Sequence, residues 1–181
     1  MRSGRVAGAA FALAVILHSL LAAKIGPAVE EYPLKAAFIL NIAKFVEWPV
    51  DVFQGPKDPI VLCVLGANPF GDALEQATRG RTADDRSFAI RHVSEVRQAA
   101  GCHILFVSVS EHKRLHTVLD EIPSSGILTV GDTDDFTKEG GVVNLRLEGD
   151  KIRIRVNVQA ATREKIRISA KLLSLAQIVN P

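Results

Sequence analysis

Three short apolar runs set the strongest limit on how this chain folds. They occupy residues 59–66, 102–108 and 126–130, and each begins beside, or ends on, a Gly or Pro. A run without regular polar alternation is typical of a strand buried on both faces of a parallel sheet. Three such strands, separated along the chain by helical segments, predict an α/β domain.

Helical patterns lie before and between these runs. In residues 31–48, Leu34, Phe38 and Ile42 recur at helical spacing, and Pro49 ends the pattern. Shorter helices are expected at 68–78, 94–100 and 110–122, a strand at 87–93, and a short helix or turn at 132–138.

The pattern changes in the C-terminal third of the chain. Strands are expected at 142–147 and 151–158, joined by Glu148-Gly149-Asp150, which is a hairpin signal. The second strand alternates apolar and charged residues, so it is predicted to lie toward a sheet edge. A last helix is expected over 160–179. The whole pattern predicts one three-layer α/β domain with a mixed sheet, a C-terminal β-hairpin and a closing helix.

Residues 1–28 have the layout of a signal peptide. Two Arg and no acid precede an almost wholly apolar stretch over 6–23, and small residues follow. Cleavage is expected after Ala23 or after Ala28 and predicts an exported domain. With the second cleavage site, this domain comprises residues 29–181. An uncleaved membrane anchor is the alternative. Removing residues 1–28 moves the formal net charge from +2 to −1, and a near-neutral domain is a poor candidate for binding nucleic acid.

The motifs that suggest catalysis or metal binding are incomplete. His112 and His116 are four residues apart, but no third ligand has a suitable spacing, so we interpret them as surface histidines. The acidic run 132–135 lacks the Gly and Glu of an EF-hand. Cys102 and His103 are adjacent on a strand, where side chains alternate, so this His cannot easily activate this Cys. No catalytic or metal-binding residue, and no cofactor, is therefore expected.

The loop after the first apolar run is a candidate site for a small ligand. Gly66 and Asn68 lie at the carboxyl end of a strand and before a helix, where α/β folds bind ligands. Arg86 or Arg91 would be the partner of an anion. The glycines fit neither a dinucleotide fingerprint nor a Walker A sequence, and a simple strand-to-helix turn is the alternative.

The two cysteines lie in or beside buried strands. If the strands are neighbours, Cys63 and Cys102 can form a disulfide in an exported protein. In the chain-entropy view such a bridge contributes roughly 3–4 kcal/mol. Two buried free thiols are the alternative.

The first helix and its end carry an excess of apolar surface. The segment 31–48 is apolar on nearly all faces, which indicates either a core helix packed between layers or a helix covered by a partner subunit. Aromatic side chains are common interface anchors, so Phe45, Trp48, Val52 and Phe53 are predicted to bind a partner. The alternative is that they form a core plug under the first strand.

Three segments together resemble the YfiR family. They are 32–49 (YPLKAAFILNIAKFVEWP), 102–108 (CHILFVS) following the strand around residue 63, and 140–144 (GGVVN) with the later 168–176 (ISAKLLSLA). The resemblance covers about residues 31–179, and Ala170 departs from the Ser that is usual in the last segment.

This resemblance implies a Rossmann-like fold and a periplasmic protein that tends to dimerise. The best-understood members are not enzymes. They restrain an inner-membrane diguanylate cyclase through its periplasmic part and so keep cyclic di-GMP low, and an OmpA-like outer-membrane lipoprotein sequesters them. Two other functions stay open for this chain, a periplasmic small-ligand sensor and an exported enzyme of unrecognised type.

Overall fold

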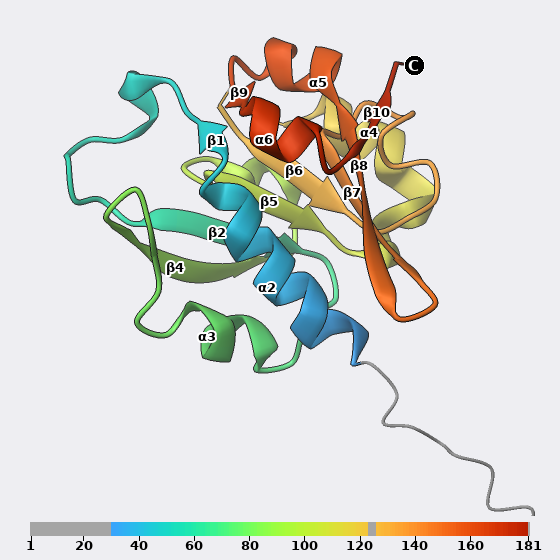
Figure 1. The fold of residues 1–181 in the computed structure, drawn as a ribbon, viewed down its shortest axis with the longest axis horizontal. Helices are drawn as coiled ribbons and strands as arrows, with labels where there is room; N and C mark the ends of the chain where they lie inside the picture. Colours follow the sequence, from blue (N-terminus) through green and yellow to red (C-terminus); the bar gives the residue numbers. More distant parts are fainter. Residues whose placement is uncertain (1–29, 123–125, 181) are drawn as a thin grey trace, which may run out of the picture.

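The computed structural model describes residues 30–122 and 126–180, so the predicted signal peptide 1–28 lies outside the described part. An eight-stranded mixed sheet forms its centre, with the order β10-β8-β7-β6-β5-β2-β4-β3 (Figure 1). The strands are β2 (Ile60–Leu65), β3 (Thr82–Ala83), β4 (Arg86–Val93), β5 (Ile104–Val107), β6 (Leu128–Gly131), β7 (Val143–Glu148), β8 (Lys151–Asn157) and β10 (Gln177–Val179).

The three apolar runs form the middle of this sheet. They become β2, β5 and β6. β5 lies between the other two and pairs in parallel with both, and β4 and β7 extend the parallel region on either side. The predicted hairpin is also present, because β7 and β8 pair antiparallel up to Glu148 and Lys151. The short strand β10 pairs in parallel with β8 and forms the sheet edge.

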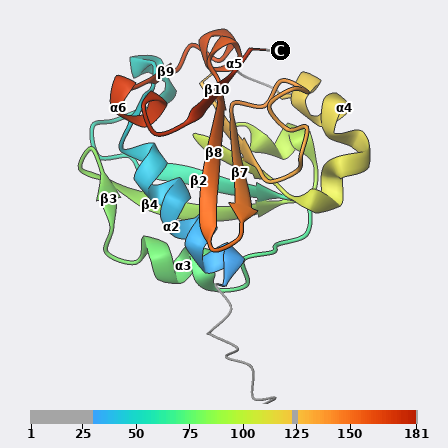
Figure 2. The ribbon, with the colours of Figure 1, turned by 45° about the vertical axis from the view of Figure 1, so that its right-hand side comes forward.

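Alternate residues of the central strands enter two different cores, as strand geometry requires. Leu62 and Val64 of β2 face the core that contains α2 (Glu31–Ala43), whereas Cys63 and Leu65 face the core that contains α4 (Leu115–Asp120). Figure 2 shows α2 and α4 on opposite sides of the strands. The three-layer, Rossmann-like α/β prediction is therefore confirmed.

The first helix is shorter than predicted. Helix α2 ends at Ala43, and the chain then extends into β1 (Val46–Glu47) instead of remaining helical to residue 48. β1 pairs antiparallel with β9 (Arg167–Ile168). The carbonyl of Phe45 also accepts a hydrogen bond from the Ser169 backbone. Pairing with this distant segment therefore explains why the residues after Ala43 are extended and not helical.

The prediction of one closing helix over 160–179 is wrong. The segment forms α5 (Val158–Arg163), β9, α6 (Ala170–Leu173) and β10. Lys165 has a φ of 58°, which ends α5, and Ser169 begins α6 by accepting a hydrogen bond from the Leu172 backbone. The β-branched residues before α6 lie in β9, which pairs with β1, and those after α6 lie in β10, which pairs with β8. The local sequence pattern does not reveal these partners.

The other helices are also short. α3 (Ala73–Thr78) follows a turn at 66–72, and 3-10 helices span Val50–Val52, Val96–Ala99 and Val109–Arg114. β8 is one strand in from the sheet edge, because β10 lies outside it. Within residues 30–122 and 126–180, no helix has both the length and the apolar character that crossing a membrane requires.

Candidate functional site

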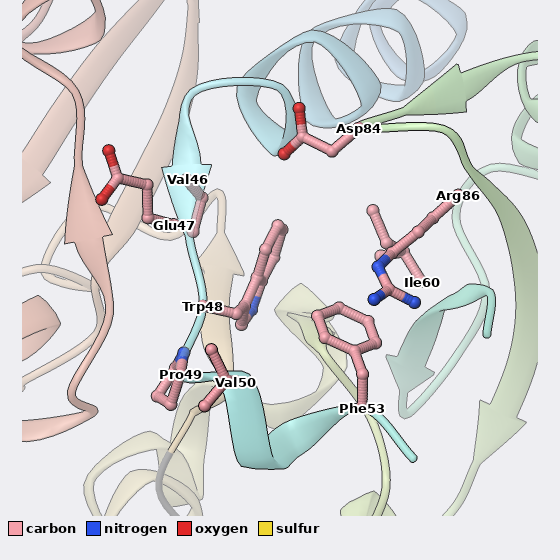
Figure 3. A pocket seen from close by; sticks show the side chains of 9 residues that line it. All are labelled: Val46, Glu47, Trp48, Pro49, Val50, Phe53, Ile60, Asp84 and Arg86. Carbon is pink, nitrogen blue, oxygen red and sulfur yellow. The ribbon is translucent and has the colours of Figure 1, made fainter. Parts of the chain in front are cut away.

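A cavity of about 350 Å³ opens at the amino end of the central parallel strands. Figure 3 shows Trp48, Phe53 and Arg86 facing a common space, with Asp84 on its upper side. The wall is mostly apolar, and Val50 is 94% exposed at its rim. We call this cavity the Trp48 pocket; its lining residues are Val46, Glu47, Trp48, Pro49, Val50, Phe53, Ile60, Asp84 and Arg86.

The pocket is held by residues from separate parts of the chain. The indole Nε1 of Trp48 donates a hydrogen bond to the carbonyl of His103 at 3.3 Å, which ties the segment after β1 to the start of β5. The rings of Trp48 and Phe53 meet edge to face, with centroids 6.2 Å apart. Such pairs add directional stabilisation to apolar burial.

Arg86 forms one wall of the pocket and is already well positioned. Its Nη1 donates hydrogen bonds to the carbonyls of Gly55 and Asp58, both at 2.9 Å. Its Cζ lies 3.7 Å from the centroid of the Phe53 ring. Because these contacts fix the guanidinium, it presents a positive charge at a defined place beside the aromatic surface.

His103 contacts both aromatic residues of the pocket. Its ring stacks on Phe53, with centroids 4.3 Å apart and an interplanar angle of 10°. Nδ1 accepts a hydrogen bond from the Val61 backbone at 3.0 Å, so Nε2 carries the proton and donates to the carbonyl of Val52 at 3.2 Å. Burial lowers the pKa of His103 below its ordinary value of 6.5. The hydrogen bond to Val52 opposes this shift, and the Arg86 charge adds to it.

These contacts predict a pH dependence of stability that originates at His103. The folded state holds the ring neutral, so at pH below 6.5 the unfolded chain binds a proton that the folded chain does not. We expect the free energy of unfolding to fall as pH decreases from 6.5 to the lowered pKa, and this contribution to level off below it. Urea unfolding of wild type and His103→Gln at pH 7.5, 6.5 and 5.5 measures the difference. Equal slopes in the two proteins would contradict it.

The structure brings two of the four predicted partner-binding residues to the pocket. Trp48 and Phe53 line it, whereas Val52 is not a lining residue and its carbonyl accepts a hydrogen bond from His103. Phe45 does not line the pocket; its ring packs against the main core, 5.4 Å from the Nζ of Lys171.

The four predicted ligand-binding residues do not come together. Gly66 lies beside Val93 at the carboxyl end of the parallel strands, whereas Arg86 begins β4 at the opposite end. The Asn68 side chain is occupied within its own turn by Phe70 and Gly71. Arg91 donates to the carbonyls of Gln98 and Ala100 and contacts the Cys102 sulfur. No small-ligand site assembled from these four residues is visible in this arrangement.

The predicted disulfide is present. Cys63 in β2 and Cys102 just before β5 are bonded, with their Cα atoms 5.9 Å apart. Both are buried in the core on the α4 side, whereas the adjacent His103 contacts Phe53. Cys102 and His103 therefore serve different parts of the fold.

His112 and His116 are both exposed. His116 lies near the carboxylates of Asp120 and Glu139, at 3.3 Å and 3.5 Å. Among the residues that the structure describes, no group of three His, Cys, Asp or Glu side chains is arranged to hold a metal ion.

Sequence reasoning did not assign a role to His103, Asp84 or Ile60, and it assigned Arg86 to another site. By itself, a His next to a Cys in a buried strand only weakly indicates a residue that helps to form a binding site. The close contact between residues 53, 86 and 103 depends on strand pairing that brings distant segments together. Most of the described residues that line the pocket are apolar, and Glu47, Asp84 and Arg86 add charge at its wall. This chemistry suits binding an apolar or aromatic group.

Comparison with known proteins adds a family and a fold. The DUF4154 family, described as YfiR/HmsC-like, matches residues 32–177. A conserved domain protein from Vibrio cholerae has a similar structure, with a TM-score of 0.57 and 10% identity over 82% of this chain. The structure of the ABC domain in complex with L-Trp from Streptococcus pneumonia is also similar, with a TM-score of 0.52 and 12% identity over 80% of this chain. This chain spans 60% of each of those two chains, and at these identities the similarity concerns the fold alone.

Proposed function

Because the chain belongs to the YfiR/HmsC-like family, we propose that it is a periplasmic regulatory protein that restrains an inner-membrane diguanylate cyclase, or a related sensor, by direct contact. The proposal assigns it no catalytic step. It includes the two other partners that the resemblance implies, an OmpA-like outer-membrane lipoprotein that sequesters the protein and a second copy in a homodimer.

The Trp48 pocket is the observation that carries this proposal. It presents two aromatic side chains and the 94% exposed Val50 on one surface. Exposed apolar side chains next to aromatic anchors are typical of protein interfaces, whose binding energy is concentrated in a few such residues. The hydrogen bonds from Trp48 to the His103 carbonyl and from Arg86 to the Gly55 carbonyl hold the pocket in shape before a partner arrives, which lowers the entropic cost of binding.

Val50→Asp is the sharpest test, because an exposed side chain can be changed with little effect on stability. A charge beside the aromatic anchors of an apolar contact should weaken partner binding by roughly 2 kcal/mol or more, about 30-fold in Kd. In cells that lack the native gene, we expect wild type to lower cyclic di-GMP and V50D to leave it high. Co-purification of the cyclase from solubilised membranes gives the direct measure of binding.

Val109→Asp is the matched control. Val109 is 55% exposed and does not line the Trp48 pocket. V109D should therefore behave as wild type in both measurements. If V50D also behaves as wild type, the partner surface lies elsewhere. If wild type itself does not lower cyclic di-GMP, the proposed regulatory role is wrong.

A further inference from the structure

A second cavity, of about 230 Å³, lies between α2 and the α3–β3 region and shares no lining residue with the Trp48 pocket. Pockets for drug-sized ligands usually measure roughly 300–1,000 Å³, so an occupant here must be small. We call this cavity the Lys44 groove. Its lining residues are Ala37, Leu40, Asn41, Lys44, Ala77, Arg81, Thr82 and Phe88.

The groove has an apolar part formed by three elements. Ala37 and Leu40 of α2 lie one helical turn apart and face Ala77 of α3 and Phe88 of β4. Leu40 is only 5% exposed, and Phe88 is half-buried against the main core. The two alanines are small, which leaves space above the larger side chains.

The polar part of the groove is positively charged. Lys44 and Arg81 both line it, and no Asp or Glu is among the described residues that do. Within residues 30–122 and 126–180, neither cation forms a salt bridge. Asn41 and Thr82 provide additional hydrogen-bond donors. Two unpaired cations beside an apolar surface favour a ligand that has one anionic end and one apolar end.

We propose that the Lys44 groove binds a small amphipathic anion, with its carboxylate or phosphate between Lys44 and Arg81 and its apolar body against Leu40 and Phe88. Residues on both sides of the groove are close in the sequence to residues that line the Trp48 pocket. Four residues after Lys44 the chain reaches Trp48, and two residues after Thr82 it reaches Asp84. The groove is nevertheless a site of its own, and the proposal does not depend on the regulatory function.

Calorimetric titration of the purified protein with phenylacetate and phenyl phosphate tests the proposal. Phenylacetamide has nearly the same shape as phenylacetate without the charge, so it should bind at least tenfold more weakly. The affinity of the anions should fall as salt rises, because the two cations are exposed. Comparison of the two anions shows whether the groove prefers a carboxylate or a phosphate.

Three variants locate the site. Lys44→Gln and Arg81→Gln should each weaken binding of the preferred anion about tenfold. Ala37→Leu should weaken it by filling the groove without changing a charge. Lys113→Gln removes an exposed cation that does not line the groove and should leave binding unchanged. Thermal unfolding verifies that each variant is folded.

Binding of neither anion at millimolar concentration would overturn the proposal. Equal binding of phenylacetamide and phenylacetate, or equal losses in Lys113→Gln and Lys44→Gln, would overturn it as well. Amide chemical-shift changes confined to the groove would support it. These measurements do not involve the cyclase, so a negative result would not count against the regulatory function proposed for the Trp48 pocket.

Discussion

Replacing Lys35 with Ala should destabilise the domain by about 3–5 kcal/mol, because it leaves the buried carboxylate of Asp132 without its partner. Lys35 is 1% exposed although it lies on the first helix. Its Nζ donates to Asp132 Oδ2 at 2.7 Å, and the side chain of Asp132 is only 4% exposed. Urea unfolding at pH 7 measures the loss against a typical total stability of roughly 5–15 kcal/mol.

Other side chains also contact Lys35, so the expected loss of stability is larger than that from breaking an ion pair on the surface. Lys35 also pairs with Glu31, and its Nζ lies 4.8 Å from the centre of the Tyr32 ring. Burial and the nearby Asp132 carboxylate raise the pKa of Tyr32 to about 12, so this side chain stays neutral. Lys35 is therefore the cation that pairs with both Glu31 and Asp132 in this cluster.

A double variant separates the charge effect from a loss of packing. Lys35→Met with Asp132→Leu removes both charges and keeps apolar volume, so it should recover much of the stability that Lys35→Met alone loses. Lys138→Ala is a suitable control, since its pair with Asp135 is exposed and should cost less than about 1 kcal/mol. A Lys35→Ala loss as small as that of the control would contradict the prediction.

Loss of the disulfide should have an effect of similar size. Cys63 and Cys102 are 39 residues apart, and closing a loop of this length contributes roughly 3–4 kcal/mol by restricting the unfolded chain. The double variant Cys63→Ala/Cys102→Ala should therefore unfold at a much lower urea concentration than the oxidised wild type. Circular dichroism follows the transition.

Reduction of the wild type provides the control for this prediction. Dithiothreitol should lower the unfolding midpoint of the wild type and leave the double variant unchanged, because the variant has no bond to reduce. The bond also fixes the residue before His103, so the double variant should also weaken the partner binding that we propose for the Trp48 pocket. Equal midpoints for oxidised and reduced wild type would show that the bridge does not stabilise the domain.

Strand predictions were more successful than helix predictions, for a physical reason. A strand buried on both faces is apolar at most positions, so β2, β5 and β6 were visible as nearly continuous apolar runs, with Thr129 in β6 the exception. The segment 160–179 has helical spacing, yet its β-branched residues pair with β1 and β8. Local periodicity contains no information about such distant partners.

The role of glycine near Phe136 illustrates the same limit. In the sequence, Gly140 and Gly141 follow directly after the short helix or turn expected at 132–138. In the structure, a Cβ on either Gly131 or Gly141 would overlap the ring of Phe136, which is fully buried. These two positions therefore require glycine because of a side chain that reaches them through the fold.

The sequence by itself determined the α/β class, the parallel centre of the sheet, the hairpin and a possible Cys63–Cys102 bond. These features depend on apolar periodicity and on short-range turn chemistry, which are written along the chain. Only the tertiary structure decided that Lys35 meets Asp132, 97 residues away, and that Arg86 and His103 both contact Phe53. A charged or polar side chain has the same local pattern whether it faces water or a buried partner, so its role depends on contacts between segments that only folding brings together.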